Sequence, residues 1–490
     1  MTTVKTRYGT FNGFVDENGV KTWLGIPFAQ PPVGKLRWQA PQPLAPSNKT
    51  FDAKKYGNDP MQASMKLGNL VDGFPTTESE DCLTLNIWAR GEGKNKPVMV
   101  WIFGGGFVCG SASEPTYNAS NFVSAHDVII VTINYRMNVF GFMNLASVDS
   151  SFEDSGYLGI KDQIAAVQWV KENIAAFGGN PDNITVFGES AGSISTSFLT
   201  IAPTAKGLFQ KVIPQSGAVG FCRTPEGSTQ VTKSFMESCG AKTVGDLMKK
   251  SGVELQKAYA EFISTREMNV ADFYPTCDGK FLPLDPFKAL KDGAARGIKI
   301  LTGTTADEWR CFLMANENLF ELVRRDPQDI SPIFSRYTKQ TNEEVYKAWL
   351  KNSPDTDDTY GDFATQADWR VAQELEAEYQ SAFEDVYHYL FTQQPSPPLE
   401  YLGAFHALDL SYTFNVPYIV PNPNQTLVKV IQAAWAAFAA TGNPDNELIP
   451  HWEKYTADNR CTMELNSKGC VLHKDLNTQN LSALRYLYEN

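Results

Sequence analysis

The 490-residue chain lacks several features that would assign it to well-defined classes of protein. It has no apolar run of 18 residues, so we expect no membrane-spanning helix and no stable membrane anchoring. Its eight cysteines form no Cys-x-x-Cys pair and it has only five histidines, which argues against a zinc site and a disulfide scaffold. With 43 Lys and Arg against 55 Asp and Glu, the net charge is −12 without a basic stripe. Nucleic acid is therefore not an expected partner.

A secretory signal is also missing from the N-terminus. The first nine residues, MTTVKTRYG, carry charge with no apolar stretch behind it. We therefore expect a cytoplasmic protein, and a mature secreted form is the alternative. Hydrophobic residues make up 42% of the chain, enough for a large core.

Candidate strands alternate with helices along most of the chain. The β-branched runs at 97–103 and 128–133 are typical of strands buried on both faces of a parallel sheet. Residues 160–177 have the apolar spacing of a helix. Further candidate strands lie at 82–88, 184–187, 211–216, 299–303 and 385–391. Together these segments predict an α/β fold with a large, mostly parallel sheet flanked by helices.

The sequence also predicts an N-terminal hairpin, the number of domains and the positions of insertions. Residues 8–14 and 21–26 flank a turn at 16–19 and predict an N-terminal β-hairpin. No linker or repeat divides the chain, so we expect one domain over residues 1–490. Helix-rich insertions are expected at about 220–295 and 310–385.

Ser190 is the strongest candidate for a catalytic residue. It lies in Gly188-Glu189-Ser190-Ala191-Gly192, directly after the apolar run 184–187. A strand that ends in Gly-x-Ser-x-Gly and turns at once into a helix holds the serine on a strained bend with its hydroxyl exposed. The motif also occurs in ordinary turns, but the strand before it and the helix-compatible residues after it favour a nucleophile.

A glycine run upstream supplies a candidate oxyanion hole. The strand at 97–103 leads into Gly104-Gly105-Gly106-Phe107, where backbone amides can point into a cleft. By itself the run reads as a flexible turn. Upstream of a nucleophile elbow, it predicts the N–H groups of Gly105, Gly106 and Ala191 as donors.

A serine nucleophile needs a base, and the base needs an orienting acid. The five candidate bases are His126, His388, His406, His451 and His473. His406 is favoured because it follows the last strong strand, as the chain order serine, acid, histidine requires. For the acid, Asp307 and Glu308 both follow the strand at 299–303, and chemistry alone does not choose between them.

These motifs resemble the type-B carboxylesterases of the α/β-hydrolase fold, which include bacterial para-nitrobenzyl esterases, animal carboxylesterases and cholinesterases. The resemblance rests on several motifs in the same order: Gly25-Ile26-Pro27-Phe28-Ala29, Ser79-Glu80-Asp81-Cys82-Leu83, Gly104-Gly105-Gly106-Phe107, Gly188-Glu189-Ser190-Ala191-Gly192, Asp307-Glu308 and Gly403-Ala404-Phe405-His406.

The resemblance implies a triad of Ser190, Glu308 and His406. It also implies that Glu189 lies near the base and that Ser216 supports the histidine. Two departures stand out. Trp309 follows the acid where the family usually has glycine, so that loop must take another path. Residues 61–80 contain no tryptophan for a choline cation, so a choline specialist is not expected.

We therefore predict a serine carboxylesterase that hydrolyses small to medium uncharged esters through an acyl-enzyme on Ser190, without metal or cofactor. The alternatives are a lipase for longer-chain acylglycerols and a non-catalytic, cholinesterase-like adhesion protein. A monomer or homodimer is expected. Residues that could line an apolar pocket are Phe107, Phe221, Met314 and Phe320.

Overall fold

The computed structural model describes residues 2–63, 77–264, 272–315, 346–347, 349–350, 357–417, 420–476 and 484–485. The large sheet contains β3 (Phe14–Val15), β4 (Val20–Pro27), β6 (Thr84–Arg90), β7 (Lys96–Ile102), β8 (Ile129–Ile133), β9 (Gly179–Glu189), β10 (Lys211–Gln215), β11 (Lys299–Thr305), β12 (Val386–Phe391), β13 (Thr462–Leu465) and β14 (Val471–His473). Their spatial order is β14-β13-β12-β11-β10-β9-β7-β8-β6-β4-β3. The strands from β8 to β13 in this order are parallel, while β14, β6, β4 and β3 are antiparallel to their neighbours.

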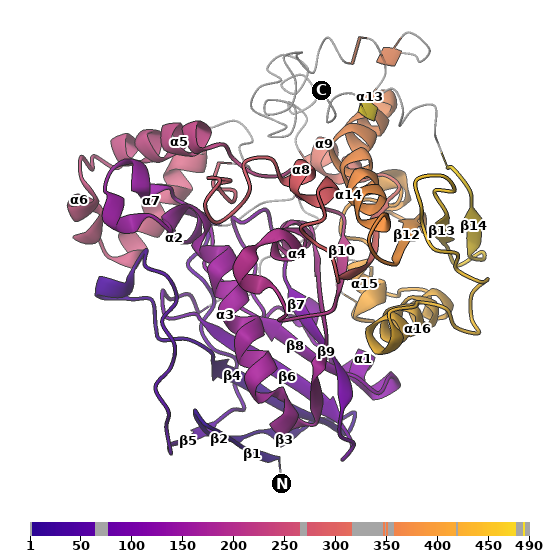
Figure 1. Cartoon of the computed structure of the whole chain (residues 1–490), viewed down its shortest axis with the longest axis horizontal. Coiled ribbons are helices and arrows are strands. Elements are labelled where there is room, and N and C mark those ends of the chain that lie inside the picture. Colours follow the sequence, from indigo (N-terminus) through magenta and orange to yellow (C-terminus); the bar gives the residue numbers. More distant parts are fainter. Residues whose placement is uncertain are drawn as a thin grey trace.

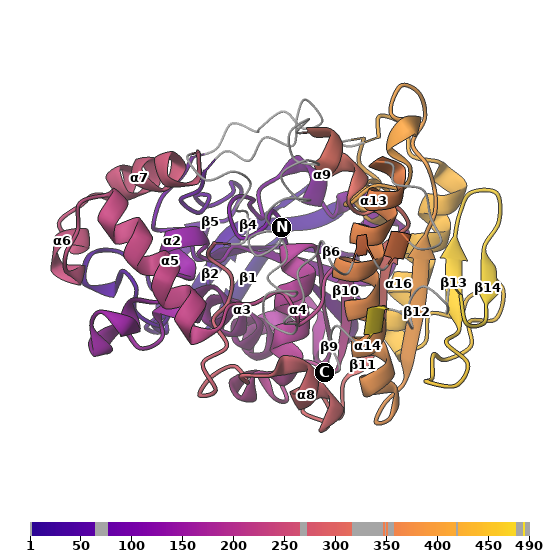
Figure 2. The ribbon, with the colours of Figure 1, turned by 90° about the horizontal axis from the view of Figure 1, so that it is seen from above.

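Helices cover both faces of this sheet (Figure 1). The α-helices among the described residues are α1 (Ser120–Ala125), α2 (Asn138–Gly141), α3 (Leu158–Asn173), α4 (Ala191–Ile201), α5 (Pro225–Ser238), α6 (Val244–Met248), α7 (Gly252–Ser264), α8 (Pro286–Lys291), α9 (Arg310–Ala315), α13 (Asp357–Ala364), α14 (Val371–Ser381), α15 (Leu410–Thr413) and α16 (Gln425–Thr441). Helices α3, α4 and α14 pack on β7 and β9 to β12, while α1 and α16 pack on β4, β6, β7 and β9. Seen from above, α5 to α7 lie at the opposite end of the molecule from β13 and β14 (Figure 2). The predicted mostly parallel sheet flanked by helices is confirmed. None of the described helices is both long enough and apolar enough to cross a bilayer.

The buried strands form where the sequence has continuous apolar runs. All residues of β8, β10 and β12 are buried, as expected for strands covered on both faces. Helix α3 and the short 3-10 helix after it (Ile174–Phe177) coincide with the helix predicted at 160–177. Gly178 then ends the helical segment with a left-handed φ of 95°.

The N-terminal hairpin differs in part from the prediction. Strands β3 and β4 pair around the predicted turn at 16–19, with Phe14 opposite Thr22. Residues 9–12, however, form β2 (Gly9–Asn12), which pairs with β1 (Thr3–Thr6) and β5 (Thr50–Asp52) in a separate three-stranded sheet. The period-2 pattern identified the extended segment but could not choose its partner, because pairing depends on tertiary contacts.

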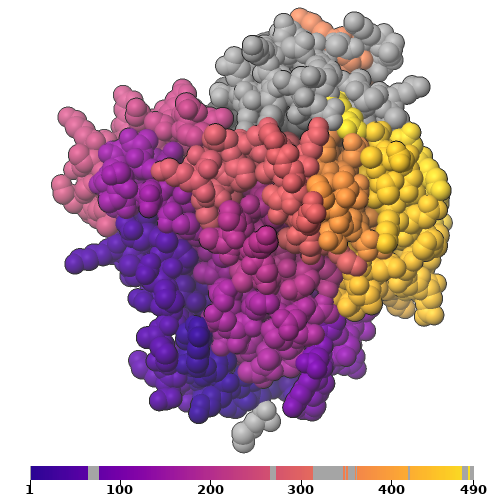
Figure 3. Space-filling model, viewed as in Figure 1, coloured from indigo at the N-terminus to yellow at the C-terminus, as the bar shows by residue number. Residues whose placement is uncertain are grey.

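Helices in the two predicted insertion ranges lie on one side of the molecule. Helices α5 to α8 come between β10 and β11, while α9, α13 and α14 come between β11 and β12. In Figure 3 the surfaces of residues 225–264 and 357–381 both lie on the upper side of the view. The description of the chain as one domain with two insertions stays a prediction.

The fold brings distant loops together at the carboxyl ends of the central strands. Glu189, at the end of β9, pairs with Gln215, at the end of β10, and Gln215 pairs with Gly303 of β11. An isolated parallel bridge joins Asp307 to Phe405 beyond the sheet edge. Ligands of open α/β sheets commonly bind at this edge. The candidate residues for catalysis therefore converge where the fold can form a site.

Candidate active site

Ser190 lies on a tight bend between β9 and α4. Its φ of 56° and ψ of −123° are unusual for a residue with a side chain, so the bend is strained. The bend also brings backbones close together, because a Cβ on Gly192 would lie 2.0 Å from the carbonyl oxygen of Ile102. Only glycine fits there. The sequence motif and the observed geometry agree with a nucleophile elbow.

The glycine run at 104–106 lies against this bend. A Cβ on Gly104 would lie 3.0 Å from Ser190 Cβ, so the loop contacts the serine side chain. Gly105 has a φ of 94°, and a Cβ there would lie 2.1 Å from the carbonyl oxygen of Cys109. In the part of the chain that the structure describes, the N–H groups of Gly105, Gly106 and Ala191 donate no hydrogen bond to protein acceptors. They remain available to a developing oxyanion.

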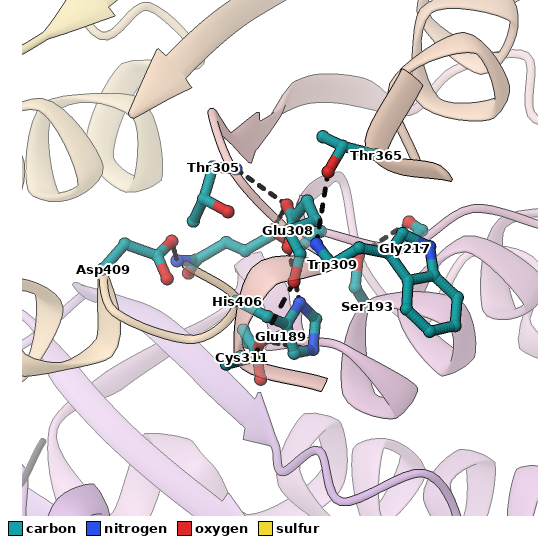
Figure 4. Close-up of polar contacts among 12 residues, drawn as sticks. Glu189, Ser193, Gly217, Thr305, Glu308, Trp309, Cys311, Thr365, His406 and Asp409 are labelled. Atoms are coloured by element: carbon teal, nitrogen blue, oxygen red, sulfur yellow. Dashed lines mark hydrogen bonds and ion pairs between the residues drawn. The ribbon is translucent and has the colours of Figure 1, made fainter. Parts of the chain in front are cut away.

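His406 is paired with Glu308. The Nδ1 atom of His406 lies 2.6 Å from Oε2 of Glu308, and both side chains are buried (Figure 4). A carboxylate only accepts hydrogen bonds, so Nδ1 carries the proton and Nε2 is left to act as a base. The other four histidines have partners elsewhere: His126 packs on Phe122, His388 contacts Thr462, His451 contacts Asp445 and His473 contacts Glu464.

The carboxylate of Glu308 is held from its other side. Its Oε1 atom accepts hydrogen bonds from Ser216 Oγ at 2.6 Å and from the backbone N–H of Thr305 at 2.7 Å. Ser216 therefore contacts the acid, and it reaches the histidine only through Glu308. Thr305 lies three residues before Glu308, whereas Ser216 is distant in sequence, so part of the acid's support comes from the fold.

Asp307, the alternative acid in the sequence, has a different role. Its N–H donates to the carbonyl oxygen of Ala404 at 3.0 Å, and its Oδ2 accepts from the N–H of Ala404 at 2.8 Å. Asp307 thus ties the acid loop to the loop that carries His406. The structure places Glu308, and not Asp307, against the imidazole.

Glu189 lies on the opposite side of His406 from Glu308 (Figure 4). Its Oε1 is 3.1 Å from Nε2 of His406, although this contact does not have hydrogen-bond geometry. Burial raises the pKa of Glu189 to about 8, and the nearby imidazole opposes that rise. Burial alone would lower the pKa of His406, but the charges of Glu189 and Glu308 outweigh it and raise that pKa to about 9.

Aromatic rings enclose the imidazole. The rings of Trp369 and Phe312 lie 4.5 Å and 5.2 Å from the His406 ring between centroids. Trp369 contacts Phe221, which contacts Tyr274, which in turn contacts Phe107 of the glycine loop. Buried aromatic residues therefore form a continuous row from the glycine loop to the imidazole.

The four residues named as a pocket from the sequence have different positions. Phe221 and Phe107 belong to the aromatic row, but Phe107 is only 1% exposed and also packs on Phe142. Met314 lies in α9. Phe320 lies outside the described residues. Sequence reasoning missed Tyr274, Phe312 and Trp369, since buried aromatic residues in helices and loops give no signal that separates pocket from core.

A strained serine after a central strand, a glycine loop with free amides and a buried histidine–carboxylate pair define a serine hydrolase of the α/β-hydrolase fold. The profile described as the Carboxylesterase family matches residues 1–484. The chain therefore belongs to the carboxylesterase family, and it is a carboxylic ester hydrolase of the serine type.

Similar proteins cover almost the whole chain. A para-nitrobenzyl esterase of Bacillus subtilis (strain 168) is 38% identical over 95% of this chain and 95% of its own length. A medium-chain fatty acyl-CoA hydrolase precursor of Anas platyrhynchos is 30% identical, covering 93% of this chain and 87% of its own. Among solved structures, a thermophilic PNB esterase matches with a TM-score of 0.87 and 35% identity over 98% of this chain and 99% of that chain.

Proposed function

We propose that Ser190, His406 and Glu308 are the nucleophile, the base and the orienting acid of this esterase. The observation that carries the proposal is the 2.6 Å contact between Nδ1 of His406 and Oε2 of Glu308, beside the bend that holds Ser190. A buried carboxylate on Nδ1 fixes the imidazole tautomer and stabilises its cation.

In the proposed reaction, Ser190 Oγ attacks the ester carbonyl while Nε2 of His406 accepts its proton. The N–H groups of Gly105, Gly106 and Ala191 then bind the tetrahedral oxyanion. Protonated His406 gives its proton to the departing alcohol, which leaves an acyl-enzyme on Ser190. Water repeats the sequence and releases the acid.

We propose that the contact between Ser190 and His406 forms when substrate binds. Nε2 of His406 has no hydrogen-bond partner among the described residues and lies nearest to Glu189. In serine hydrolases the bond between nucleophile and base often forms fully only in the substrate complex. Glu189 directly precedes Ser190 in the chain, so we propose that a movement of the imidazole on substrate binding brings Nε2 from Glu189 to Ser190 Oγ.

The proposed substrates are small to medium esters without charge. The aromatic row from Phe107 to Trp369 supports an apolar acyl or alcohol group next to His406. The name of one relative, a para-nitrobenzyl esterase, points in the same direction. We also propose that the enzyme is located in the cytoplasm and that it is a monomer or a homodimer. All eight cysteines lie among the described residues and none forms a disulfide, which suits a reducing compartment.

The choice between esterase and lipase is open to a direct test. We expect hydrolysis of a butyrate ester to saturate in dilute solution, below the solubility limit of the ester. Emulsified long-chain triacylglycerol should be hydrolysed more slowly and without a jump in rate when droplets form. Initial rates across the solubility limit measure both. A rate that rises sharply only with droplets would favour the lipase, and no hydrolysis of either substrate would favour a non-catalytic protein.

The carboxylates beside His406 predict a pH profile shifted to alkaline values. The base must be neutral, so kcat/KM should rise with pH, with a midpoint above the ordinary imidazole value of 6.5 and toward about 9. Glu189→Gln removes one of the two negative charges. The pKa of His406 should then fall, and the midpoint should move to lower pH.

A matched control is Glu114→Gln. Burial raises the pKa of the Glu114 carboxyl to about 7, but its partner is the backbone N–H of Ser111. This variant should keep the midpoint of the parent enzyme. If Glu189→Gln left the midpoint in place or moved it upward, Glu189 would not act on the base through its charge.

A further inference from the structure

Trp309 replaces the glycine that usually follows the acid in this family, and the structure shows how the loop accommodates it. The backbone N–H of Trp309 donates to Oγ1 of Thr365 at 3.2 Å (Figure 4). Its indole Nε1–H donates to Oδ2 of Asp368 at 3.0 Å. The side chain of Trp309 is only 9% exposed. Both its main chain and its side chain are therefore held by one segment distant in sequence.

That segment is a π-helix, Thr365–Arg370, whose six residues are all buried. Such helices are rare and frequently occur at functional sites. Besides Thr365 and Asp368, it presents Arg370, whose Nη2 lies 3.4 Å and 3.3 Å from the carbonyl oxygens of Thr305 and Ala306. Three side chains of the π-helix thus contact the loop on both sides of Glu308.

The helix that follows continues the same support. On α14, Gln373 accepts the N–H of Gly217 at 3.0 Å, and Glu376 accepts the N–H of Val219 at 3.4 Å. These residues fix the loop that carries Ser216, which donates to Glu308. The two loops that set the position of the Glu308 carboxylate are therefore anchored to one continuous helical segment.

Trp309 also contacts the residues around the base. Its ring packs edge-on against Phe312 at 5.5 Å, and Phe312 lies 5.2 Å from the His406 ring. Trp369, which follows Asp368 in the π-helix, contacts the base directly, because its ring centroid lies 4.5 Å from that of His406. A shift of Trp309 would thus disturb the acid through the backbone and the imidazole through Phe312.

We infer that Trp309 and Asp368 form a positioning pair that directs the Glu308 carboxylate at Nδ1 of His406. With its successor fixed at two points, residue 308 loses backbone freedom, and Oε2 stays within 2.6 Å of the imidazole. Asp368 is only 4% exposed, and a buried carboxylate without a donor would be costly. The indole N–H supplies a donor to its Oδ2 and ties it to the loop. The inference rests on the proposed roles of Glu308 and His406.

The test compares Trp309→Phe, Asp368→Leu and Asp368→Asn. The first keeps an aromatic ring but removes the indole donor, the second removes the acceptor, and the third keeps an acceptor oxygen. Trp452→Phe is the matched control, because Trp452 is also buried but packs on Tyr387 near the start of β12, at the other end of that strand from the site. For each protein, reactive serines are counted with a fluorophosphonate, and kcat, KM and the pH profile are measured per reactive site.

We expect Trp309→Phe and Asp368→Leu to lose kcat by on the order of 10- to 100-fold per titrated site, with KM within about threefold of the parent. The acidic limb of the profile of kcat/KM against pH should move to lower pH, because Glu308 no longer raises the pKa of His406. Asp368→Asn should keep most of the kcat of the parent. Trp452→Phe should match the parent in kcat and pH profile. A role in folding alone would reduce the number of titrated sites and leave the pH profile unchanged.

The inference is overturned if Trp309→Phe keeps the parent kcat and pH profile, or if Trp452→Phe loses as much. It is equally overturned if Asp368→Asn is as impaired as Asp368→Leu. Should Asp368→Leu fail to fold, Trp309→Phe and Asp368→Asn still decide the question. If the parent enzyme gives no fluorophosphonate adduct, the proposed triad fails first, which separates that failure from a failure of the pair.

Discussion

Replacing Ser190 with alanine is expected to lower kcat for a short-chain ester by on the order of a millionfold. The variant keeps the proposed oxyanion donors but lacks the hydroxyl that is proposed to form the acyl-enzyme. Because the bend is strained with serine already in place, alanine at 190 should leave the fold and the affinity for substrate largely unchanged. Steady-state rates with protein purified from a host without esterase activity would measure the loss.

Ser195→Ala is the matched control. It lies on the same helix, α4, and its Oγ accepts a hydrogen bond from Gln163 at 2.9 Å. This variant should keep the turnover of the parent. A phosphonate adduct should be found on Ser190 in the parent enzyme and be absent from Ser190→Ala. Hydrolysis that survives in Ser190→Ala would place the chemistry elsewhere.

The fold and the parts of the site built from contiguous motifs could be predicted from sequence. The strand before Ser190, the helix after it and the glycine run at 104–106 are local features, and their backbone requirements are visible in the residue types. The β-branched runs of β7 and β8 predicted buried strands, because they too are local features of residue type. These features depend little on the rest of the chain.

Contacts across loops could not be predicted in this way. From chemistry alone, Asp307 and Glu308 were equivalent, and only the resemblance to the family chose between them. In the structure they differ because Asp307 faces the backbone of Ala404 and Glu308 faces His406. Neighbouring residues on a bend point in different directions, and the bend itself is fixed by the distant π-helix.

The edges of the sheet show the same limit. Strands β13 and β14 have four and three residues and were not predicted, since short segments carry little periodicity. The first strands were identified as extended, but residues 9–12 pair outside the large sheet. In both places the partner strand, and not the local sequence, determines the structure.

Removing the imidazole of His406 is expected to reduce kcat about as much as removing the serine, again on the order of a millionfold. His406→Ala removes the proposed base of Ser190 and leaves Glu308 facing a cavity between the rings of Phe312 and Trp369. Added imidazole is expected to restore part of the activity, because a free ring can enter this cavity. The residual rate without imidazole should lose the acidic limb of the pH profile.

His451→Ala is the control for this variant, because its side chain is 75% exposed and its partner is Asp445, apart from the site. It should hydrolyse esters like the parent. A double variant of Ser190 and His406 should be no slower than either single variant, since the two residues act as one unit in the proposed step. If the two losses multiplied instead, each residue would contribute independently, and the proton transfer from Ser190 to His406 would not be part of the reaction.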